Sequence, residues 1–306
     1  MDLQTLSVES ANIARRESAW QRLRRNWSVR LGGYALLLMI LVAFAAPLLG
    51  TVDPSLFDAA SRDLRPGESG EILTLEGETL KHTFRMGSDS FGRDIYSRVL
   101  YGTRVSLAVG VGAAALALAF GIVLGLCAGY LRWLDGPLMR VMDGLMAIPA
   151  ILLAIALVAL WRAGIGTVVA AIAITEIPRV TRLVRALVLS IREEPYVEAA
   201  VSLGTPTAKI MFGHILPNCI APLLVQGTYI VAFAILVEAI LSFLGVGLPP
   251  DIPTWGNIMA EGRVQFVAYP HNVFFPGIFL AVTVLAVNML GDGLRDTLDP
   301  KMAKRV

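Results

Sequence analysis

The sequence has few charged residues, and this shortage excludes an ordinary soluble protein. Charged residues make up 16% of the 306 residues, while hydrophobic residues make up 56%. Soluble domains normally carry about 25% charged residues, so the composition favours a protein whose solvent is the lipid bilayer. The net charge of +2, spread over short runs between apolar segments, gives no support for nucleic-acid binding.

Cysteine and histidine are also scarce, and those present are too scattered to form a site. Cys127 and Cys219 lie in or beside apolar segments without paired spacing, so we expect neither a disulfide framework nor a zinc site. His82, His214 and His271 lie far apart in the sequence, which argues against a metal site or a catalytic triad. The phosphate-binding pattern Gly-x-x-x-x-Gly-Lys-(Ser/Thr) does not occur in the sequence. We therefore expect a non-catalytic chain without a cofactor or metal site, whose energy comes from a separate protein.

Long apolar windows are what the sequence does contain. A membrane span needs about 20 mostly apolar residues, and six windows approach or exceed that length: 31–50, 105–131, 145–161, 165–183, 219–244 and 273–290. The first window follows an Arg-rich arm rather than a short charged segment, so we expect it to remain as a membrane helix. The predicted fold class is an all-α membrane protein with six transmembrane helices.

The distribution of Lys and Arg predicts the orientation, because cytoplasmic loops retain these residues. With the N-terminus inside, the short outer connections hold only Arg162 and Arg263. Both termini are therefore predicted to lie in the cytoplasm. The predicted organisation is a cytoplasmic arm at 1–30, a first transmembrane helix at 31–50, an extracytoplasmic segment at 51–104, a five-helix core at 105–292 with a cytoplasmic loop at 193–218, and a cytoplasmic tail at 293–306.

The outer segment contains two short stretches with the character of strands. Residues 72–75 and 79–84 flank Glu76-Gly77-Glu78, a pattern that predicts a small β-hairpin. We do not expect it to form a separate domain.

The loop between the fourth and fifth windows is too polar to cross the bilayer and too apolar to be a disordered linker. Pro195 is placed as the first residue of a helix, and Gly204 is typical of a helix terminator. Thr205-Pro206 then supplies an N-cap followed by a proline at the first helical position. The sequence thus predicts a helix, a glycine bend and a second helix closed by Pro217.

The first of these two helices has a face of small residues. Val197, Ala200, Val201 and Gly204 share one side at helical spacing, while Glu198 points elsewhere. Such a face at the mouth of a helix bundle suits a groove on another protein.

This loop resembles the coupling loop of ABC importer permeases, the element that docks in a cleft of the ATPase subunit. The matching pattern is Glu198-Ala199-Ala200, three residues, Gly204, nine residues, and an apolar turn ending in Leu216-Pro217. Residues 213–218 look like the Arg-His-(Ile/Val)-Leu-Pro-Asn form of the peptide-importer branch, with Gly213 in place of arginine. The resemblance implies the following coupling residues: Glu198, Ala199, Ala200, Gly204, Thr205, Pro206, His214, Leu216 and Pro217.

Three further stretches resemble the second permease type of the dipeptide, oligopeptide, nickel and glutathione importers. Residues 87–98 are similar to the signature Gly-Thr-Asp-x-x-Gly-Arg-Asp-x-x-Ser-Arg that precedes the second span in that branch. Residues 241–256 resemble the exit of its fifth span, and residues 290–300 resemble its C-terminus. The resemblance covers nearly the whole chain from Trp20 onward, although residues 67–84 look longer than is typical.

The resemblance implies a type I ABC importer permease fold and a multi-pass subunit of the bacterial inner membrane. Its expected role is to couple ATP hydrolysis by separate subunits to the import of peptides or related small solutes. The implied partners are a second homologous permease, two ATP-binding subunits that use ATP and Mg, and an extracytoplasmic solute-binding protein. The implied docking face for that protein comprises loops 51–104 and 245–272, with these candidate residues: Asp89, Arg93, Asp94, Arg98 and Trp255.

Two acidic residues lie inside apolar windows and need compensation. An isolated carboxylate at mid-bilayer costs about 2.5 to 3.5 kcal/mol on insertion scales. Glu238 is therefore either a pore-facing acid near the translocation path or a carboxyl that is hydrogen-bonded to a neighbouring helix or subunit. Glu176, just ahead of Pro178, is expected to have a structural use where a break in the helix satisfies it.

Two further patterns predict local packing. Gly121, Gly125 and Gly129 recur every four residues inside an apolar helix, which predicts a helix-packing stripe. Asp135, Arg140 and Asp143 flank the turn between the second and third windows, where we expect a solvated cluster of ion pairs.

An ion-coupled secondary transporter is the alternative from another functional class. That class is expected to show inverted repeats and several ionisable groups at mid-membrane, whereas only Glu238 lies deep here and no convincing repeat is found. A membrane-embedded enzyme has less support, because no nucleophile-base pair or His-containing metal cluster occurs within a window.

Overall fold

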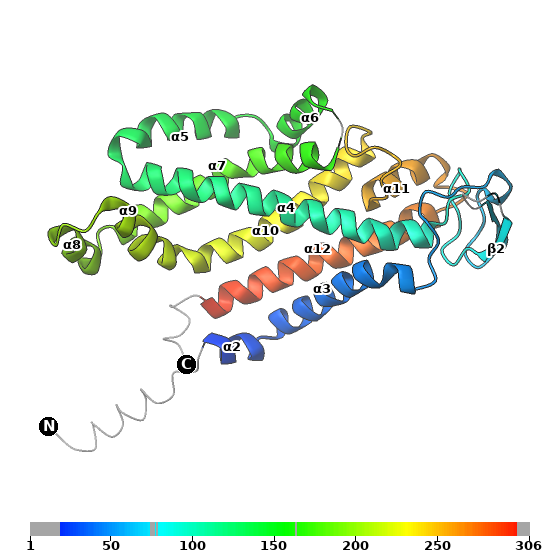
Figure 1. Cartoon of the computed structure of the whole chain (residues 1–306), viewed down its shortest axis with the longest axis horizontal. Coiled ribbons are helices and arrows are strands. Elements are labelled where there is room, and N and C mark those ends of the chain that lie inside the picture. Colours follow the sequence, from blue (N-terminus) through cyan, green and yellow to red (C-terminus); the bar gives the residue numbers. More distant parts are fainter. Residues whose placement is uncertain (1–18, 74–76, 78, 163, 299–306) are drawn as a thin grey trace, which may run out of the picture.

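The chain forms an elongated bundle of helices with a small sheet at one end (Figure 1). This computed structural model describes residues 19–73, 77, 79–162 and 164–298. Residues 1–18 of the predicted arm and 299–306 of the predicted tail lie outside the described residues. The long helices are α3 (Trp27–Ala45), α4 (Ile95–Tyr130), α5 (Arg132–Met146), α6 (Ala150–Leu160), α7 (Ile165–Ile191), α10 (Leu216–Phe243) and α12 (His271–Leu298).

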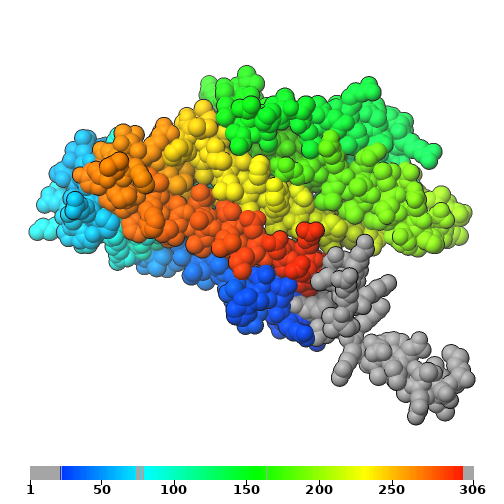
Figure 2. Space-filling view, turned by 180° about the vertical axis from the view of Figure 1, so that it is seen from behind, coloured from blue at the N-terminus to red at the C-terminus, as the bar shows by residue number. Residues whose placement is uncertain are grey.

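Short elements occupy the two ends of the bundle (Figure 1). One end, which we call the hairpin end, carries strands β1 (Ser69–Leu73) and β2 (Thr79–Thr83) and helix α11 (Trp255–Gly262). The other end, which we call the elbow end, carries helices α8 (Pro195–Ser202) and α9 (Thr207–Ile210), with α2 (Ala19–Arg25) and the end of α12 nearby. Seen from behind, α12 lies between α3 and α10 along the bundle (Figure 2).

Among the described residues, four helices are long and apolar enough to cross a membrane on length and composition alone. They are Trp27–Leu48, Ile95–Tyr130, Thr207–Phe243 and His271–Leu298. These four contain the first, second, fifth and sixth predicted windows, apart from a few residues at the window ends. The fourth window lies on α7, which carries Glu176 just before its midpoint and Arg179, Arg182 and Arg185 in its second half. Pro178 lies inside α7 and does not end it, so the predicted helix break beside Glu176 is wrong.

The third predicted window, 145–161, does not form a single straight helix. Helices α5 and α6 meet at a bend of 90° and would count as a fifth span only if taken as one broken element. Pro149 is the N-cap of α6, and a proline disfavours helical geometry at the residue before it. Helix α6 has 11 residues, which corresponds to a length of about 16 Å, too short to cross the hydrocarbon core alone.

Helices α4 and α7 pack tightly along the glycine stripe, as predicted. A Cβ atom added at Gly121, Gly125 or Gly129 would lie 2.5 to 2.6 Å from the Cβ atom of a valine on α7. These valines follow at the same four-residue spacing: Val180, Val184 and Val188. The two backbones therefore approach closely only because these positions lack side chains.

The predicted hairpin is confirmed by the antiparallel pairing of β1 and β2. Ser69 pairs with Thr83, and Ile72 pairs with Leu80. Ile72 and Phe84 are buried beneath the sheet, which fixes its position on the bundle. Residues 74–76 and 78, part of the predicted strand and turn, lie outside the described residues.

Candidate functional site

The elbow consists of α8, a bend at Gly204 and α9, which confirms the predicted order of helix, glycine bend and helix. Gly204 has φ of 73°, in the left-handed region that favours glycine. Its N–H donates to the carbonyl of Val201 at 2.9 Å, and the N–H of Thr205 donates to the carbonyl of Ala200 at 3.1 Å. These two bonds form a Schellman motif, which satisfies the last carbonyls of α8 and fixes the direction in which the chain leaves the helix.

The predicted small-residue face of α8 is only partly correct. Val197 and Ala200 are buried, and Val197 belongs to a core cluster with Ile210 and Met211. Val201 is 53% exposed, and Gly204 is also exposed. The prediction failed because the residues after the bend, Ile210 and Met211, cover the side of α8 that carries Val197 and leave Val201 exposed.

The outward side of the elbow carries an apolar surface, which we call the elbow patch. It contains Leu203, which is 85% exposed, and three other half-exposed residues: Tyr196, Val201 and Phe212. The acidic Glu198 is exposed beside them. Exposed apolar groups on a protruding element are typical of surfaces that meet another protein or the membrane.

The second half of the elbow departs from the prediction in two ways. Thr205 is not the N-cap of α9: that position is held by Pro206, without a side-chain capping bond. Pro217 does not close the helix, because a π-helical turn at Met211–Ile215 leads directly into α10. Pro217 stands where the π-helical turn passes into α10, inside a helical stretch that runs without a break from Thr207 to Phe243.

One hydrogen bond joins α8 to the start of α10. The side-chain nitrogen of Asn218 donates to the carbonyl of His214 at 2.7 Å and to the hydroxyl of Tyr196 at 3.2 Å. Burial, together with the negative charge of Glu194, raises the pKa of Tyr196. Its hydroxyl accepts the Asn218 hydrogen bond, which links α8 to the start of α10.

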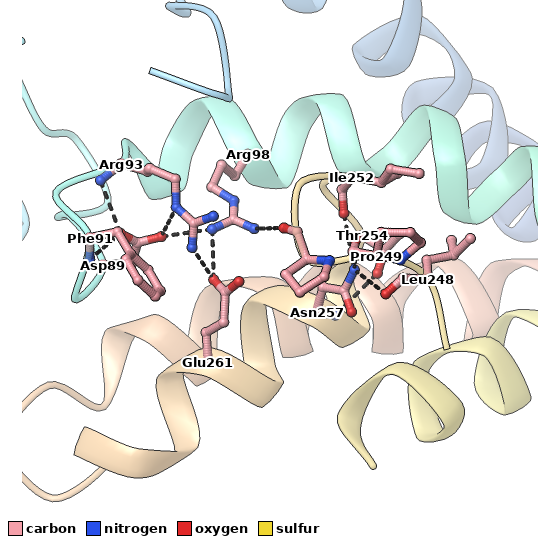
Figure 3. Close-up of polar contacts among 11 residues, drawn as sticks. Asp89, Phe91, Arg93, Arg98, Leu248, Pro249, Ile252, Thr254, Asn257 and Glu261 are labelled. Atoms are coloured by element: carbon pink, nitrogen blue, oxygen red, sulfur yellow. Dashed lines mark hydrogen bonds and ion pairs between the residues drawn. The ribbon is translucent and has the colours of Figure 1, made fainter. Parts of the chain in front are cut away.

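A network of ion pairs occupies the hairpin end (Figure 3). Asp89 accepts hydrogen bonds from Arg93 Nε and Arg98 Nη1, both at 2.7 Å. Arg98 Nη1 also lies 2.7 Å from Glu261 Oε2, and Arg93 Nη2 pairs with the same oxygen. Arg98 and Asp89 are almost fully buried, so two cations and two carboxylates neutralise one another between the start of α4 and α11. We call these four residues the charge clamp.

The candidate docking residues are mostly internal. Asp89, Asp94, Arg98 and Trp255 are buried within this chain. Asp94 is the N-cap of α4 and accepts from the N–H of Ser97 at 2.9 Å, while Trp255 Nε1 donates to the carbonyl of Val99 at 3.2 Å. These side chains shape the loops and are not surface groups, so direct contact with a partner is not expected of them.

Sequence reasoning missed Glu261 and Asn257 as parts of this end. The Asn257 side chain donates to the carbonyls of Leu248, Pro249 and Ile252, which fixes the loop before α11 (Figure 3). A charge count could have suggested Glu261. Asp94 serves as the N-cap of α4, so residues 87–98 have two arginines but only one carboxylate, Asp89, left to pair with them. The second carboxylate is Glu261, which comes from the outer loop 245–272.

Glu238 lies inside the chain. It is fully buried near the hairpin end of α10, and Ser242 Oγ donates to its Oε1 at 2.8 Å. Its other oxygen, Oε2, has no hydrogen-bond partner among the described residues. Burial favours the structural interpretation of Glu238, and a role in the translocation path stays a prediction.

The acidic residues after α4 pair with α7. Arg185 donates to Asp135 at 2.5 and 2.7 Å, and Arg182 donates to Asp143 at 2.5 Å. All four side chains are partly exposed, as expected for solvated pairs. They connect two helices instead of lying within the predicted turn, because α5 continues as a helix of 15 residues.

The sequence matches two protein families. The family described as "Binding-protein-dependent transport system inner membrane component" matches residues 117–304. The family described as "N-terminal TM domain of oligopeptide transport permease C" matches residues 16–66. Together they cover the first membrane helix and the chain from residue 117 to residue 304, which includes the elbow.

Individual relatives match over nearly their whole length. The chain is 49% identical to the probable peptide ABC transporter permease protein y4tQ of Sinorhizobium fredii over 282 residues, 92% of each chain. It is 42% identical to the dipeptide transport system permease protein DppC of Alkalihalophilus pseudofirmus, over 93% of this chain and 89% of that one. It is 41% identical to the glutathione transport system permease protein GsiD of Pectobacterium atrosepticum, over 92% and 90%.

The fold has a counterpart among solved structures. An inward-facing structure of the MetNI methionine ABC transporter aligns with a TM-score of 0.54 and 17% identity, over 66% of this chain and 96% of that chain. The glycine-hinged elbow, the two family matches and this structural similarity agree with one another. The chain belongs to the binding-protein-dependent transport system inner membrane component family, the permease subunits of ABC importers in the inner membrane.

Proposed function

We propose that this permease imports peptides or related small solutes as one of two homologous permease subunits. The observation that carries the proposal is the exposed elbow patch on a glycine-hinged element at one end of an apolar bundle. Relatives named for transport of peptides, dipeptides and glutathione support the solute class. Nickel importers are only a related branch.

The proposed topology has six membrane-crossing segments with both termini and the elbow in the cytoplasm. The segments are α3, α4, the bent pair α5 and α6, α7, α10 and α12. The position of α2 and of the end of α12 at the elbow end supports this arrangement (Figure 1). The Arg-rich stretch before α3 supports it too, because cytoplasmic segments retain basic residues.

In the proposed mechanism, separate subunits bind ATP and Mg and move this chain through the elbow. The elbow patch would sit in a cleft of an ATPase subunit, so that closure of two ATPase subunits pushes α8 and its bend as a unit. Because the Asn218–Tyr196 hydrogen bond joins α8 to the start of α10, the push would reach the bundle and switch access between the two sides of the membrane.

The hairpin end is the proposed docking face for an extracytoplasmic binding protein. The charge clamp holds loops 51–104 and 245–272 against each other. Docking would therefore use the outer surface of loops whose shape the buried residues maintain.

Copurification tests this proposal. The tagged chain, extracted in mild detergent, is expected to bring down two ATP-binding subunits and a second permease. The variant Leu203→Asp, which places a charge in the elbow patch, is expected to lose the ATP-binding subunits and keep the second permease. Uptake that continues without ATP, by a chain that copurifies with neither, would instead support the ion-coupled alternative.

A further inference from the structure

Arg179 is an arginine about halfway along α7. Twelve residues separate it from the helix end at Ile191, about 18 Å at 1.5 Å per residue. Its side chain is 42% exposed, while that of Glu176, one turn earlier, is fully buried. A charged side chain thus lies far from the end of α7 and is exposed on the surface of this chain.

Two aromatic rings on α10 hold the Arg179 side chain. The guanidinium carbon lies 5.5 Å from the ring centre of Tyr229 and 5.8 Å from that of Phe233. The two rings stack on each other with centres 6.2 Å apart, and Arg179 Nη1 lies 3.4 Å from the Tyr229 hydroxyl. Cation–π contacts of this kind orient an arginine without occupying its hydrogen-bond donors.

Glu176 binds only one nitrogen of Arg179. Nη1 lies 3.2 and 3.1 Å from the two Glu176 oxygens. Within the described part of the chain, Nε and Nη2 have no hydrogen-bond partner. An arginine edge with two parallel donors matches the two oxygens of a carboxylate.

The Arg179 side of α7 is distinct from its apolar side. Ala170, Ala173, Ile174 and Ile177 of α7 line an apolar hollow with Leu116 and Phe120 of α4. Positions 177 and 179 lie about 160° apart around a helix of 3.6 residues per turn. Ionisable residues inside membrane segments face a water-filled path or a partner rather than lipid. We therefore expect the Arg179 side of α7 to face water or a partner, and the side with the apolar hollow to face lipid.

We propose that Arg179 binds the carboxylate of a peptide-like solute within the translocation path. The inference rests on the proposed function, because it names the part of the solute that this permease recognises. Glu176 positions the guanidinium, Tyr229 and Phe233 hold it flat, and its free edge receives the carboxylate. Gln226, three residues before Tyr229 on α10, has a side-chain nitrogen without a partner among the described residues and offers a further donor on this side.

Uptake of two matched peptides tests the carboxylate contact. The complete complex, with its binding protein, is reconstituted in liposomes and supplied with the dipeptide Ala-Phe or with its C-terminal amide. Arg179→Gln is expected to lower uptake of Ala-Phe about tenfold and uptake of the amide less than twofold, each relative to the wild-type rate for that peptide. Arg179→Lys is expected to give an intermediate loss. Arg140→Gln, at an exposed arginine of α5, is the matched control and is expected to change neither rate.

Thiol labelling gives a second measurement that does not depend on transport. Val225→Cys, one turn before Tyr229 on α10, in a background with Cys127 and Cys219 replaced by alanine, is expected to react with a water-soluble methanethiosulfonate reagent. Ala-Phe should slow the reaction, the amide should not, and the protection should disappear when Arg179→Gln is added.

Equal losses for both peptides, or no loss with either, would overturn the carboxylate contact. Loss of the second permease from purified Arg179→Gln complex would also overturn it, and would assign Arg179 to a contact between subunits. If the assembled wild-type complex hydrolyses ATP but takes up neither peptide, the peptide assignment itself fails and the carboxylate ligand fails with it. If the thiol of the Val225→Cys variant stays unreactive, this face of α10 is not exposed to water, and the Arg179 site is rejected while the proposed function stands.

Discussion

Replacement of Gly204 by valine is expected to lower ATP-driven uptake at least about tenfold, while the complex stays assembled. A left-handed conformation costs roughly 1 to 2 kcal/mol for a residue with a side chain, and a β-branched residue there is a genuine outlier. A Cβ atom at Gly204 would meet no atom within 4 Å, so the effect comes from the backbone alone. The strain breaks the Schellman motif, redirects the chain after α8 and moves the elbow patch.

Two substitutions serve as controls for the Gly204 experiment. Gly204→Asn is expected to keep most of the uptake, because asparagine tolerates the left-handed region. Gly213→Ala lies in the π-helical turn after α9, where an added Cβ would approach no atom closer than 4.0 Å, and it is expected to behave like the wild type. Uptake and transport-linked ATP hydrolysis that remain unchanged in Gly204→Val would show that the bend does not transmit force.

Replacement of Arg98 by methionine is expected to destabilise the hairpin end by about 3 to 5 kcal/mol, the cost of leaving buried charge unpaired. Arg98 is 1% exposed and bridges Asp89 and Glu261, both 2.7 Å from its Nη1. Without it, Arg93 alone faces two carboxylates. Thermal unfolding of the complex in lipid nanodiscs measures the loss, with Arg140→Met as the exposed control.

A double variant separates the charge effect from lost packing. Adding Glu261→Gln to Arg98→Met removes one of the unpaired carboxylates and is expected to restore part of the stability. If Arg98→Met unfolds within about 1 kcal/mol of the wild type, the clamp is no more than a surface ion pair.

Four of the six predicted membrane helices and the elbow were predictable because their signals are local. Runs of apolar residues mark the spans, and Pro195 and Gly204 mark where α8 begins and ends. The hairpin was predictable for the same reason. The bend before α6 was missed because hydropathy treats Pro149 as one residue in an apolar run, although it fixes the backbone that precedes it.

The sites at the two ends of the bundle were less predictable because their partners are distant in sequence. Arg93 and Glu261 are separated by 168 positions, and no local pattern pairs them. The motif at 87–98 could be recognised, yet recognition did not reveal that most of its charged groups point inward. No sequence pattern distinguishes Arg179 from its neighbours Arg182 and Arg185, and only its contacts with Tyr229 and Phe233 on α10 reveal its separate environment.

Labelling of Leu203→Cys tests the central claim, that the elbow lies in the cytoplasm and contacts the ATP-binding subunits. In a background with Cys127 and Cys219 replaced by alanine, a membrane-impermeant maleimide should react in inside-out vesicles stripped of ATP-binding subunits. Adding those subunits back should block the reaction, and intact cells should stay unlabelled. Labelling from the outer surface of intact cells would contradict the account.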